Sequence, residues 1–406
     1  MNLSYFIAKR ISREHREGFS STIHKIAVVS IGVGLAAMLV SFLIMMGFQE
    51  TVMHKIYGFS GNLQVVTYTN SNSLEEIPMD YDIDLYRNYK EYPYVEHIQE
   101  YAHKAGLIKT DDEVFGVVLK GVGKSFDTLA FHENIVEGSF INLPDSGYAN
   151  EVLLSKVIAD KLNSKVGDDI VIHFFQQPPR SRRLKVTGIY ETNLSEYFDS
   201  KVVIGDIRLI RRLEGWADSI AGGLEIFVTD ARHIDEAGRA IKQKIDYDLN
   251  IVKVSDKYIQ VFEWLGLVNR QVAILLVIIL AVVCINMTSI VFILVMERTQ
   301  MIGMLKALGA SNELVRSVFV YHGISLIVKG LAFGNILGLG LCFIQYKFEL
   351  ITLNAKDYYM SVVPISWHWE IVLMLNVLTF TVVTLILFIP TIIITRINPI
   401  KTIRFD

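Results

Sequence analysis

Residues 272–295 read VAILLVIILAVVCINMTSIVFILV, a run of 24 residues without a formal charge. A helix that crosses the hydrocarbon core of a membrane needs about 20 mostly apolar residues. Residues 26–48 and 371–394 are also uncharged and predict two further spans. Residues 317–344 predict a fourth span, although Lys329 lies near its middle. Together with a hydrophobic content of 51%, these stretches predict an integral membrane helical bundle rather than a single soluble domain.

The first apolar stretch follows 25 mostly polar residues and lacks a small-residue cleavage site, so it predicts an anchor rather than a signal peptide. Cys284 and Cys342 both fall inside predicted spans, which argues against a disulfide framework. The histidines form no HxxxH pair and no CxxC occurs, so we expect no metal site and no cofactor.

The segments between the predicted spans differ in length and charge. They are residues 1–25, 49–271, 296–316, 345–370 and 395–406. Basic residues concentrate in the first, third and last of them, which the positive-inside rule assigns to the cytoplasm. The large segment is then external. Its residues 49–270 hold 25 Lys and Arg against 34 Asp and Glu, a net charge of −9, which argues against nucleic-acid binding.

The large external segment mixes two periodicities, which predicts an α+β domain. Runs rich in β-branched and aromatic residues predict strands at residues 63–69, 114–122, 169–175, 184–190 and 224–228. Helical spacing of apolar residues occurs at residues 155–163 and 234–245.

A stiff connection lies between two of these predicted strands. It is made of Gln176, Gln177, Pro178, Pro179 and Arg180, followed by Ser181, Arg182 and Arg183. Two prolines and three arginines predict a cationic hairpin tip on an acidic domain. The tip is either a solvated loop or a docking element for an external partner.

Small residues recur every four positions in the predicted third span, at Gly330, Gly334 and Gly338. This pattern lets two helix backbones approach closely, and helix packing is its expected role. For the neighbouring Lys329 we expect snorkelling or pairing within the bundle rather than substrate binding.

Residues 296–311, MERTQMIGMLKALGAS, directly follow the second predicted span. Ile302, Leu305 and Leu308 form a short apolar stripe, and Gly309 can end a helix. The segment predicts a small amphipathic helix on the cytoplasmic side. Such a helix either lies on the lipid interface or inserts into a groove on a cytosolic partner.

ERTQMIGMLKALGAS resembles the ERxxEIGxLrAlGas signature of FtsX-like, MacB-type ABC transporter permeases. Further similarities point to the lipoprotein-releasing LolC/LolE permeases within that family. Met46, Gly47, Phe48 and Glu50 resemble the MNGFexE motif at the end of their first span. Weaker matches are Phe6, Ile7, Ala8 and Arg10 at the start, residues 160–168 and 186–189 in the middle, and Pro399, Ile403 and Arg404 at the end.

The resemblance implies an inner-membrane permease with a MacB-like periplasmic domain and an FtsX-like permease domain at about residues 268–399. It assigns ATPase coupling to the segment after the second span, through Glu297, Arg298, Ile302, Gly303, Leu305, Lys306, Leu308 and Gly309. It places the shorter hairpin, Gln176 to Arg180, where LolC-type subunits carry a hook that docks a carrier. Contacts with lipid chains are expected near the outer ends of the first two spans, at Met46, Phe48, Leu265 and Val268.

Hydrolysis of ATP is expected from a separate subunit. Gly121, Gly123 and Lys124 resemble the end of a phosphate loop, but Val118 stands where that loop requires glycine. The resemblance therefore implies two LolD-type ATPase copies and a second permease, identical or paralogous. Together they would move a lipoprotein from the inner membrane to a periplasmic carrier.

Three other functions are alternatives. A MacB-like exporter of a peptide, drug or toxin usually carries a fused ATPase domain, which this sequence lacks. An FtsX-like regulator of cell-wall hydrolases usually has a shorter external domain. A membrane-anchored enzyme would need a nucleophile, base and acid set, which the motifs do not suggest.

Overall fold

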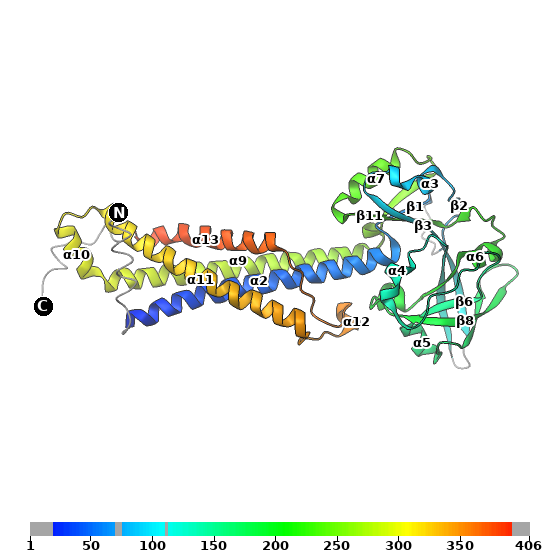
Figure 1. The fold of residues 1–406 in the computed structure, drawn as a ribbon, viewed down its shortest axis with the longest axis horizontal. Helices are drawn as coiled ribbons and strands as arrows, with labels where there is room; N and C mark the ends of the chain where they lie inside the picture. The colour runs from blue at the N-terminus through cyan, green and yellow to red at the C-terminus, as the bar shows by residue number, and fades with distance from the viewer. Residues whose placement is uncertain (1–18, 70–74, 110–112, 392–406) are drawn as a thin grey trace. The chain divides into compact units, whose positions relative to one another are not determined.

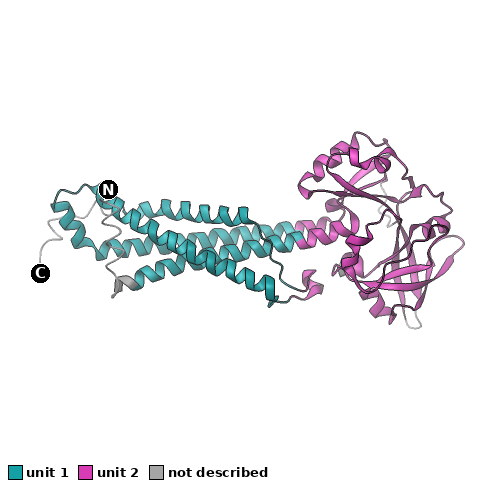
Figure 2. Cartoon of the chain, in the orientation of Figure 1, with its two compact units in different colours: residues 1–50, 264–352, 362–406 teal, residues 51–263, 353–361 magenta. Residues whose placement is uncertain are grey.

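The computed structural model describes residues 19–69, 75–109 and 113–391. Most of the predicted N-terminal segment and the predicted tail, residues 395–406, lie outside the described residues. The chain divides into two compact units, shown in different colours in Figure 2. We call them the helical unit, residues 1–50, 264–352 and 362–406, and the sheet unit, residues 51–263 and 353–361.

Within the described residues, four helices are long and apolar enough to cross a membrane (Figure 1). They are α2 (Phe19–Ser60), α9 (Ile259–Glu297), α11 (Asn312–Phe348) and α13 (Trp369–Thr391). Helices α2 and α9 are longer than the spans predicted within them, because polar residues past the apolar core do not end a helix. The predicted fold class, a membrane bundle with an α+β domain between its first two helices, is confirmed.

The helical unit buries apolar side chains between its long helices. One cluster lies around Ile31, Met287 and Ile327, and a second around Leu39 and Leu375. A polar pair links two of these helices, as expected where a membrane interior offers no water as a partner. Asn335 of α11 and Asn376 of α13 exchange two hydrogen bonds, at 2.7 and 3.0 Å.

In the described part of the sheet unit, ten strands form one mixed sheet. Its order is β12-β1-β11-β3-β4-β9-β6-β8-β5, and β7 pairs with both β3 and β8. The strands are β1 (Leu63–Thr67), β3 (Val95–Lys109), β4 (Val114–Val122), β5 (Ile135–Gly138), β6 (Glu151–Ser155), β7 (Asp169–Phe174), β8 (Arg180–Tyr190), β9 (Val202–Asp206), β11 (Gly223–Val228) and β12 (Leu249–Lys253). A small separate sheet pairs β2 (Met79–Asp80) with β10 (Ile220–Ala221).

Shorter helices lie between the strands in the chain. They are α3 (Asp84–Arg87), α4 (Thr128–Phe131), α5 (Lys156–Leu162), α6 (Ile207–Glu214) and α7 (Ile234–Lys242). Helix α8 (Val254–Lys257) leads from β12 into α9, and α12 (Ala355–Tyr358) lies in the chain between α11 and α13. Helix α5 begins at a cap that its sequence provides, since the Ser155 hydroxyl accepts a hydrogen bond from the Ile158 amide.

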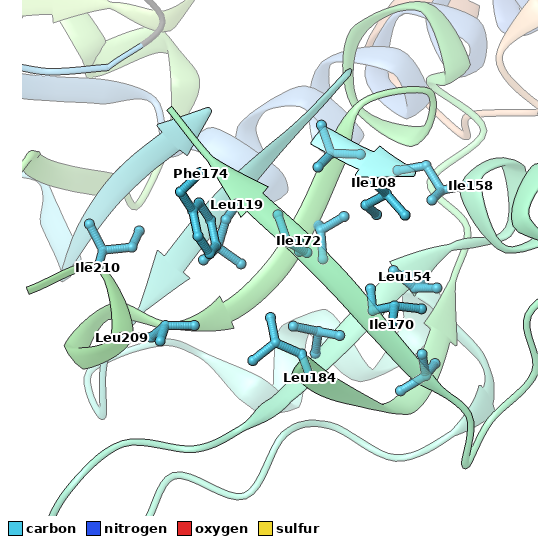
Figure 3. Packing of buried hydrophobic residues seen from close by; sticks show 14 of the residues in the cluster. Ile108, Leu119, Leu154, Ile158, Ile170, Ile172, Phe174, Leu184, Leu209 and Ile210 are labelled. Atoms are coloured by element: carbon cyan, nitrogen blue, oxygen red, sulfur yellow. The ribbon is translucent and has the colours of Figure 1, made fainter. Parts of the chain in front are cut away.

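Six of the described strands close into a ring, β3-β4-β9-β6-β8-β7, because β7 returns to pair with β3. Figure 3 shows the apolar side chains that fill this ring, among them Leu119, Ile172 and Leu184. Gly106 lies where β3 meets β7, and a Cβ there would lie 2.7 Å from the Ile172 side chain. Glycine therefore permits the close approach of strands that closes the ring.

A second core lies beside the open part of the sheet, where β12, β1, β11 and the first half of β3 pair. It contains Leu63, Ile226 and the apolar face of α7. The 15-residue β3 strand belongs to both parts, since its first half pairs with β11 and its second half with β4.

Candidate functional site

The segment after the second span folds as a short helix between two long ones. A single residue, Arg298, separates the end of α9 from helix α10 (Thr299–Ala307). Gly309 follows it with a φ of +91°, a left-handed conformation that glycine adopts readily. The Ser311 hydroxyl then accepts a hydrogen bond of 3.2 Å from the Leu314 amide and caps α11. These turn residues fix where α10 ends and where the third long helix begins.

Helix α10 has one face packed on the helical unit and one face open. Ile302 and Gly303 are buried, and Ile302 contacts the cluster that includes Val295 and Val315. Leu305 is partly buried against the same cluster.

The open face of α10 carries two large apolar side chains. Met304 is 57% exposed and Leu308 is 85% exposed. Within the predicted stripe, Ile302 and Leu305 pack on the cluster, whereas Leu308, which follows the last helical residue Ala307, is exposed like Met304. Met304 was not among the predicted residues, although its spacing of four residues from Leu308 was the available signal.

The charged residues of this segment flank the open face. Glu297 is exposed at the end of α9, and Arg298 and Lys306 are half-buried. The surface around α10 thus combines exposed apolar side chains with charges of both signs. This composition is typical of a protein interface, whereas a helix that lies on lipid usually carries a basic polar face.

The glycines of α11 contact α2 at close range. A Cβ at Gly334 would lie 2.7 Å from the carbonyl oxygen of Gly32, and one at Gly330 would lie 2.7 Å from the Ile31 Cβ. A Cβ at Gly338 would lie 3.0 Å from the Ala36 Cα. The helix backbones thus meet along small residues on both sides. Lys329, beside this ridge, is exposed on the isolated subunit.

Two of the four residues expected to contact lipid are covered by the chain itself. Phe48 is 8% exposed and packs edge-on against the Trp264 ring, with 5.3 Å between centroids. Leu265 is buried, and its carbonyl accepts a hydrogen bond from the Gln49 side chain. Met46 and Val268 are half-buried and keep part of their surface open.

The MGFQE motif holds the segment that precedes α13. A Cβ at Gly47 would lie 2.8 Å from the carbonyl oxygen of Pro364, so glycine permits the segment to pass. Glu50 accepts a hydrogen bond from the Ser366 hydroxyl at 2.5 Å and contacts the His368 ring at 2.5 Å. Tryptophans flank this histidine on both sides, as in the aromatic belts of membrane interfaces.

The hairpin between β7 and β8 differs from its prediction. Its strands extend to Phe174 and from Arg180, so the three arginines lie in β8 rather than at the tip. The Arg180 guanidinium donates a hydrogen bond of 3.0 Å to the Leu213 carbonyl. The tip, residues 175–179, is therefore uncharged.

Most of this tip is open to solvent. Phe175, Gln177, Pro178 and Pro179 are exposed, and Gln176 is half-buried. The exposed surface of the tip thus combines a phenylalanine with two prolines, so it is apolar and stiff instead of cationic as predicted.

No group of three or more His, Cys, Asp and Glu side chains is placed to hold a metal ion within the residues that the structure describes. The Lys124 and Ser125 of the rejected phosphate-loop match make other contacts. Lys124 pairs with Asp145, and Ser125 donates a hydrogen bond to Glu100.

The described geometry defines a class of protein, a multi-pass membrane protein with a large α+β domain between its first two spanning helices. Two family models match the chain. The MacB-like periplasmic core domain matches residues 26–244, and the FtsX-like permease C-terminal domain matches residues 273–399.

Curated relatives match the chain over most of their own length. The lipoprotein-releasing system transmembrane protein LolE of Haemophilus influenzae is 22% identical, covering 93% of this chain and 93% of that protein. LolC of Xylella fastidiosa is 21% identical, and the match covers 100% of this chain and 98% of that protein. Among solved structures, the periplasmic region of MacB from Actinobacillus actinomycetemcomitans is 13% identical, covers 52% of this chain and 97% of that one, and has a TM-score of 0.34.

The chain belongs to the MacB-like and FtsX-like ABC transporter permeases, and lipoprotein-releasing LolC and LolE permeases are among its relatives. It is a multi-pass protein of the inner membrane, and its relatives are permease subunits of ABC transporters.

Proposed function

We propose that this chain is the permease subunit of a transporter that extracts lipoproteins from the inner membrane and passes them to a periplasmic carrier. The observation that carries this proposal is its similarity to lipoprotein-releasing permeases over 93% or more of the chain. The external domain is of the MacB-like type, and an ABC permease of this group works with an ATPase and a second permease.

In this proposal α10 transmits the ATPase stroke. Its buried residues, Ile302 and Gly303, fix it to the helical unit, and its open residues, Met304 and Leu308, insert into a groove on a LolD-type ATPase. Glu297, Arg298 and Lys306 set the register of that contact, and Gly309 with Ser311 lets α10 push on α11. Two ATPase copies serve two permease subunits.

The acyl chains of the substrate contact the outer ends of the first two spans. Met46 and Val268 keep accessible surface in the isolated subunit. Phe48 and Leu265 join the contact when α2 and α9 separate, since Phe48 of α2 packs on Trp264 of α9 and Leu265 of α9 accepts a hydrogen bond from Gln49 of α2. The exposed tip of the β7–β8 hairpin then docks the carrier that receives the lipoprotein.

Photocrosslinking tests the identity of the substrate. A photoreactive residue replaces Val268 in the native membrane, together with an ATPase subunit that binds but does not hydrolyse ATP, and adducts are identified by mass spectrometry. The matched control carries the probe at Leu385, an exposed position of α13. We expect acylated peptides at Val268 and only free lipid at Leu385.

Other adducts at Val268 would contradict the proposal. An unacylated peptide would favour MacB-like export, and the absence of any peptide adduct would favour FtsX-like regulation.

A further inference from the structure

The C-terminal end of α2 lies in the sheet unit and runs directly into the sheet. Gly61 ends the helix with a φ of +71°, and its amide donates a hydrogen bond of 2.8 Å to the Tyr57 carbonyl. The next residue, Asn62, donates to the Ile226 carbonyl of β11 at 2.8 Å, and β1 begins at Leu63. The last carbonyls of α2, at Phe59 and Ser60, are thus presented to the sheet.

A buried lysine holds the first of these carbonyls. Lys120 of β4 is 1% exposed, and its ammonium donates a hydrogen bond of 2.5 Å to the Phe59 carbonyl. The same ammonium lies 4.6 Å from the centre of the Phe59 ring. A cation at this point also complements the negative end of the helix dipole.

The charge of Lys120 is balanced by Glu225 of β11, which is fully buried. The two carboxylate oxygens lie 2.7 and 3.0 Å from the ammonium. Gln99 of β3 donates a further hydrogen bond of 2.8 Å to Glu225. Strands β11, β3 and β4 are neighbours, so one residue from each of three central strands contributes to this cluster, which we call the α2 clamp.

The second carbonyl has its own partner from β1. The Gln64 side chain donates a hydrogen bond of 3.1 Å to the Ser60 carbonyl and accepts one of 2.9 Å from the Lys257 ammonium. Ser60, Gln64 and Lys257 all belong to the sheet unit. The last turn of α2 is therefore fixed by directional bonds both to β4 and to β1.

Stability alone does not account for the α2 clamp. Burying an ion pair costs desolvation energy that its attraction often fails to offset, and apolar replacements can be as stable. Buried polar groups can instead fix one arrangement among several, because their hydrogen bonds are directional. The arrangement fixed here is the position of the α2 terminus on the sheet.

We propose that Lys120 is a positioning residue that joins the first membrane-spanning helix to the sheet, so that a movement of α2 moves strands β4 and β11 with it. This inference rests on the proposed function, since it needs an ATP-driven movement of α2. The helix is continuous from Phe19 to Ser60, so a displacement that begins in its membrane segment reaches its clamped end.

The first test separates ATP hydrolysis from release. The full transporter is purified with Lys120→Met/Glu225→Gln, which removes both charges of the ion pair together, and reconstituted with a fluorescent triacylated lipopeptide. We expect near-normal ATP hydrolysis, while lipopeptide released per ATP falls about tenfold, which is a typical coupling between distant sites. The conservative variant Lys120→Arg, which still donates to a carbonyl and a carboxylate, restores most of the release. An unchanged release per ATP in the folded double variant would overturn the proposal.

A second measurement avoids altering the clamp. Spin labels replace His54 of α2 and Glu96 of β3, both exposed in the sheet unit, and their distance is measured without nucleotide and with ATP trapped. A clamped helix end predicts the same distance in both states, and a change would overturn the proposal.

Failure of the proposed function gives a different pattern from failure of the clamp. If the unmodified transporter releases no lipopeptide, the proposed function is wrong, whereas a distance that changes in a releasing transporter refutes only the clamp.

Discussion

Helix α2 contacts α11 through small residues in its membrane segment and contacts the sheet through a buried ion pair at its other end. Along α11 the contacts are those of Gly32 and Ala36 with Gly334 and Gly338, which are van der Waals contacts without direction. At its C-terminal end the contacts are hydrogen bonds from Lys120 and Gln64 to two carbonyls. Van der Waals contacts between small residues allow one helix to shift along another, whereas a shift at the other end would break the hydrogen bonds to the two carbonyls. If α2 moves during transport, as the proposed function requires, we expect the shift to occur along α11 and not at the clamped end of α2.

The largest expected effect comes from filling the glycine contact. Gly334→Leu forces a side chain against the Gly32 carbonyl, and overpacking of this kind costs on the order of 3 kcal/mol. We expect much less folded transporter in detergent and a lower melting temperature. Gly340→Leu on the same helix is the matched control, because a Cβ there meets nothing within 4 Å. Equal losses for both variants would show that the close contact does not matter.

The next effect concerns the open face of α10. Met304→Asp/Leu308→Asp should lower the ATPase activity stimulated by the permease by about tenfold or more, as for central apolar residues of an interface. The measurement is ATP hydrolysis by the reconstituted complex. Leu350→Asp, another exposed leucine in the same unit, is the control and should leave hydrolysis unchanged.

Gly303 is a poor position at which to test docking. It is buried against the helical unit, so a large residue there would disturb packing and docking together. If the Met304 and Leu308 variant hydrolyses ATP normally, α10 lies on the lipid interface rather than in a groove.

A smaller effect is expected at the hairpin tip. Pro178→Ala/Pro179→Ala loosens a segment that binding would have to order again, which costs about 1 kcal/mol, or fivefold in affinity for a carrier. The affinity is measured by pull-down of the periplasmic carrier with the intact transporter. Arg180→Ala is the contrast, because its guanidinium contacts the Leu213 carbonyl and lies outside the tip. Carrier binding lost only with Arg180→Ala would contradict an uncharged docking tip.

The smallest effect is expected at the contact between Glu50 and His368. Both side chains are partly exposed, and pairs of this kind contribute about 0.5 kcal/mol. Glu50→Gln should lower the melting temperature slightly, and Ser366→Ala should lower it less. A large loss of release with normal melting would instead assign Glu50 a role in the transport cycle.

The membrane helices could be predicted from the sequence because an uncharged run of sufficient length has few alternatives. Strand β4 was predicted with its observed bounds, since its β-branched residues are buried on both faces near the ring. Strand β3 was missed because Glu96, Gln99, Glu100 and Lys104 interrupt its apolar pattern. These polar residues are stabilised by partners far along the chain, such as Glu225 for Gln99, which no local pattern reveals.

The candidate sites could be predicted only in part, because their partners also lie far along the chain. The glycine spacing in α11 pointed to a packing surface, but not to Gly32 and Ala36 as its partners. The sequence placed Arg180 at the hairpin tip, whereas its strand pairing with Phe174 puts it in β8, because strand pairing rather than composition decides where the hairpin turns. Lys120 gave no signal at all, since its partners Phe59 and Glu225 are 61 and 105 positions away.

The central claim is that ATP drives this permease to release a lipoprotein, and one measurement tests it most directly. The transporter is reconstituted into vesicles that hold a fluorescent triacylated lipopeptide and, separately, the same peptide without acyl chains. With ATP we predict transfer of the acylated peptide alone to an added soluble carrier, and none with a non-hydrolysable analogue. Transfer of the unacylated peptide, or no ATP-dependent transfer of either, would contradict the claim.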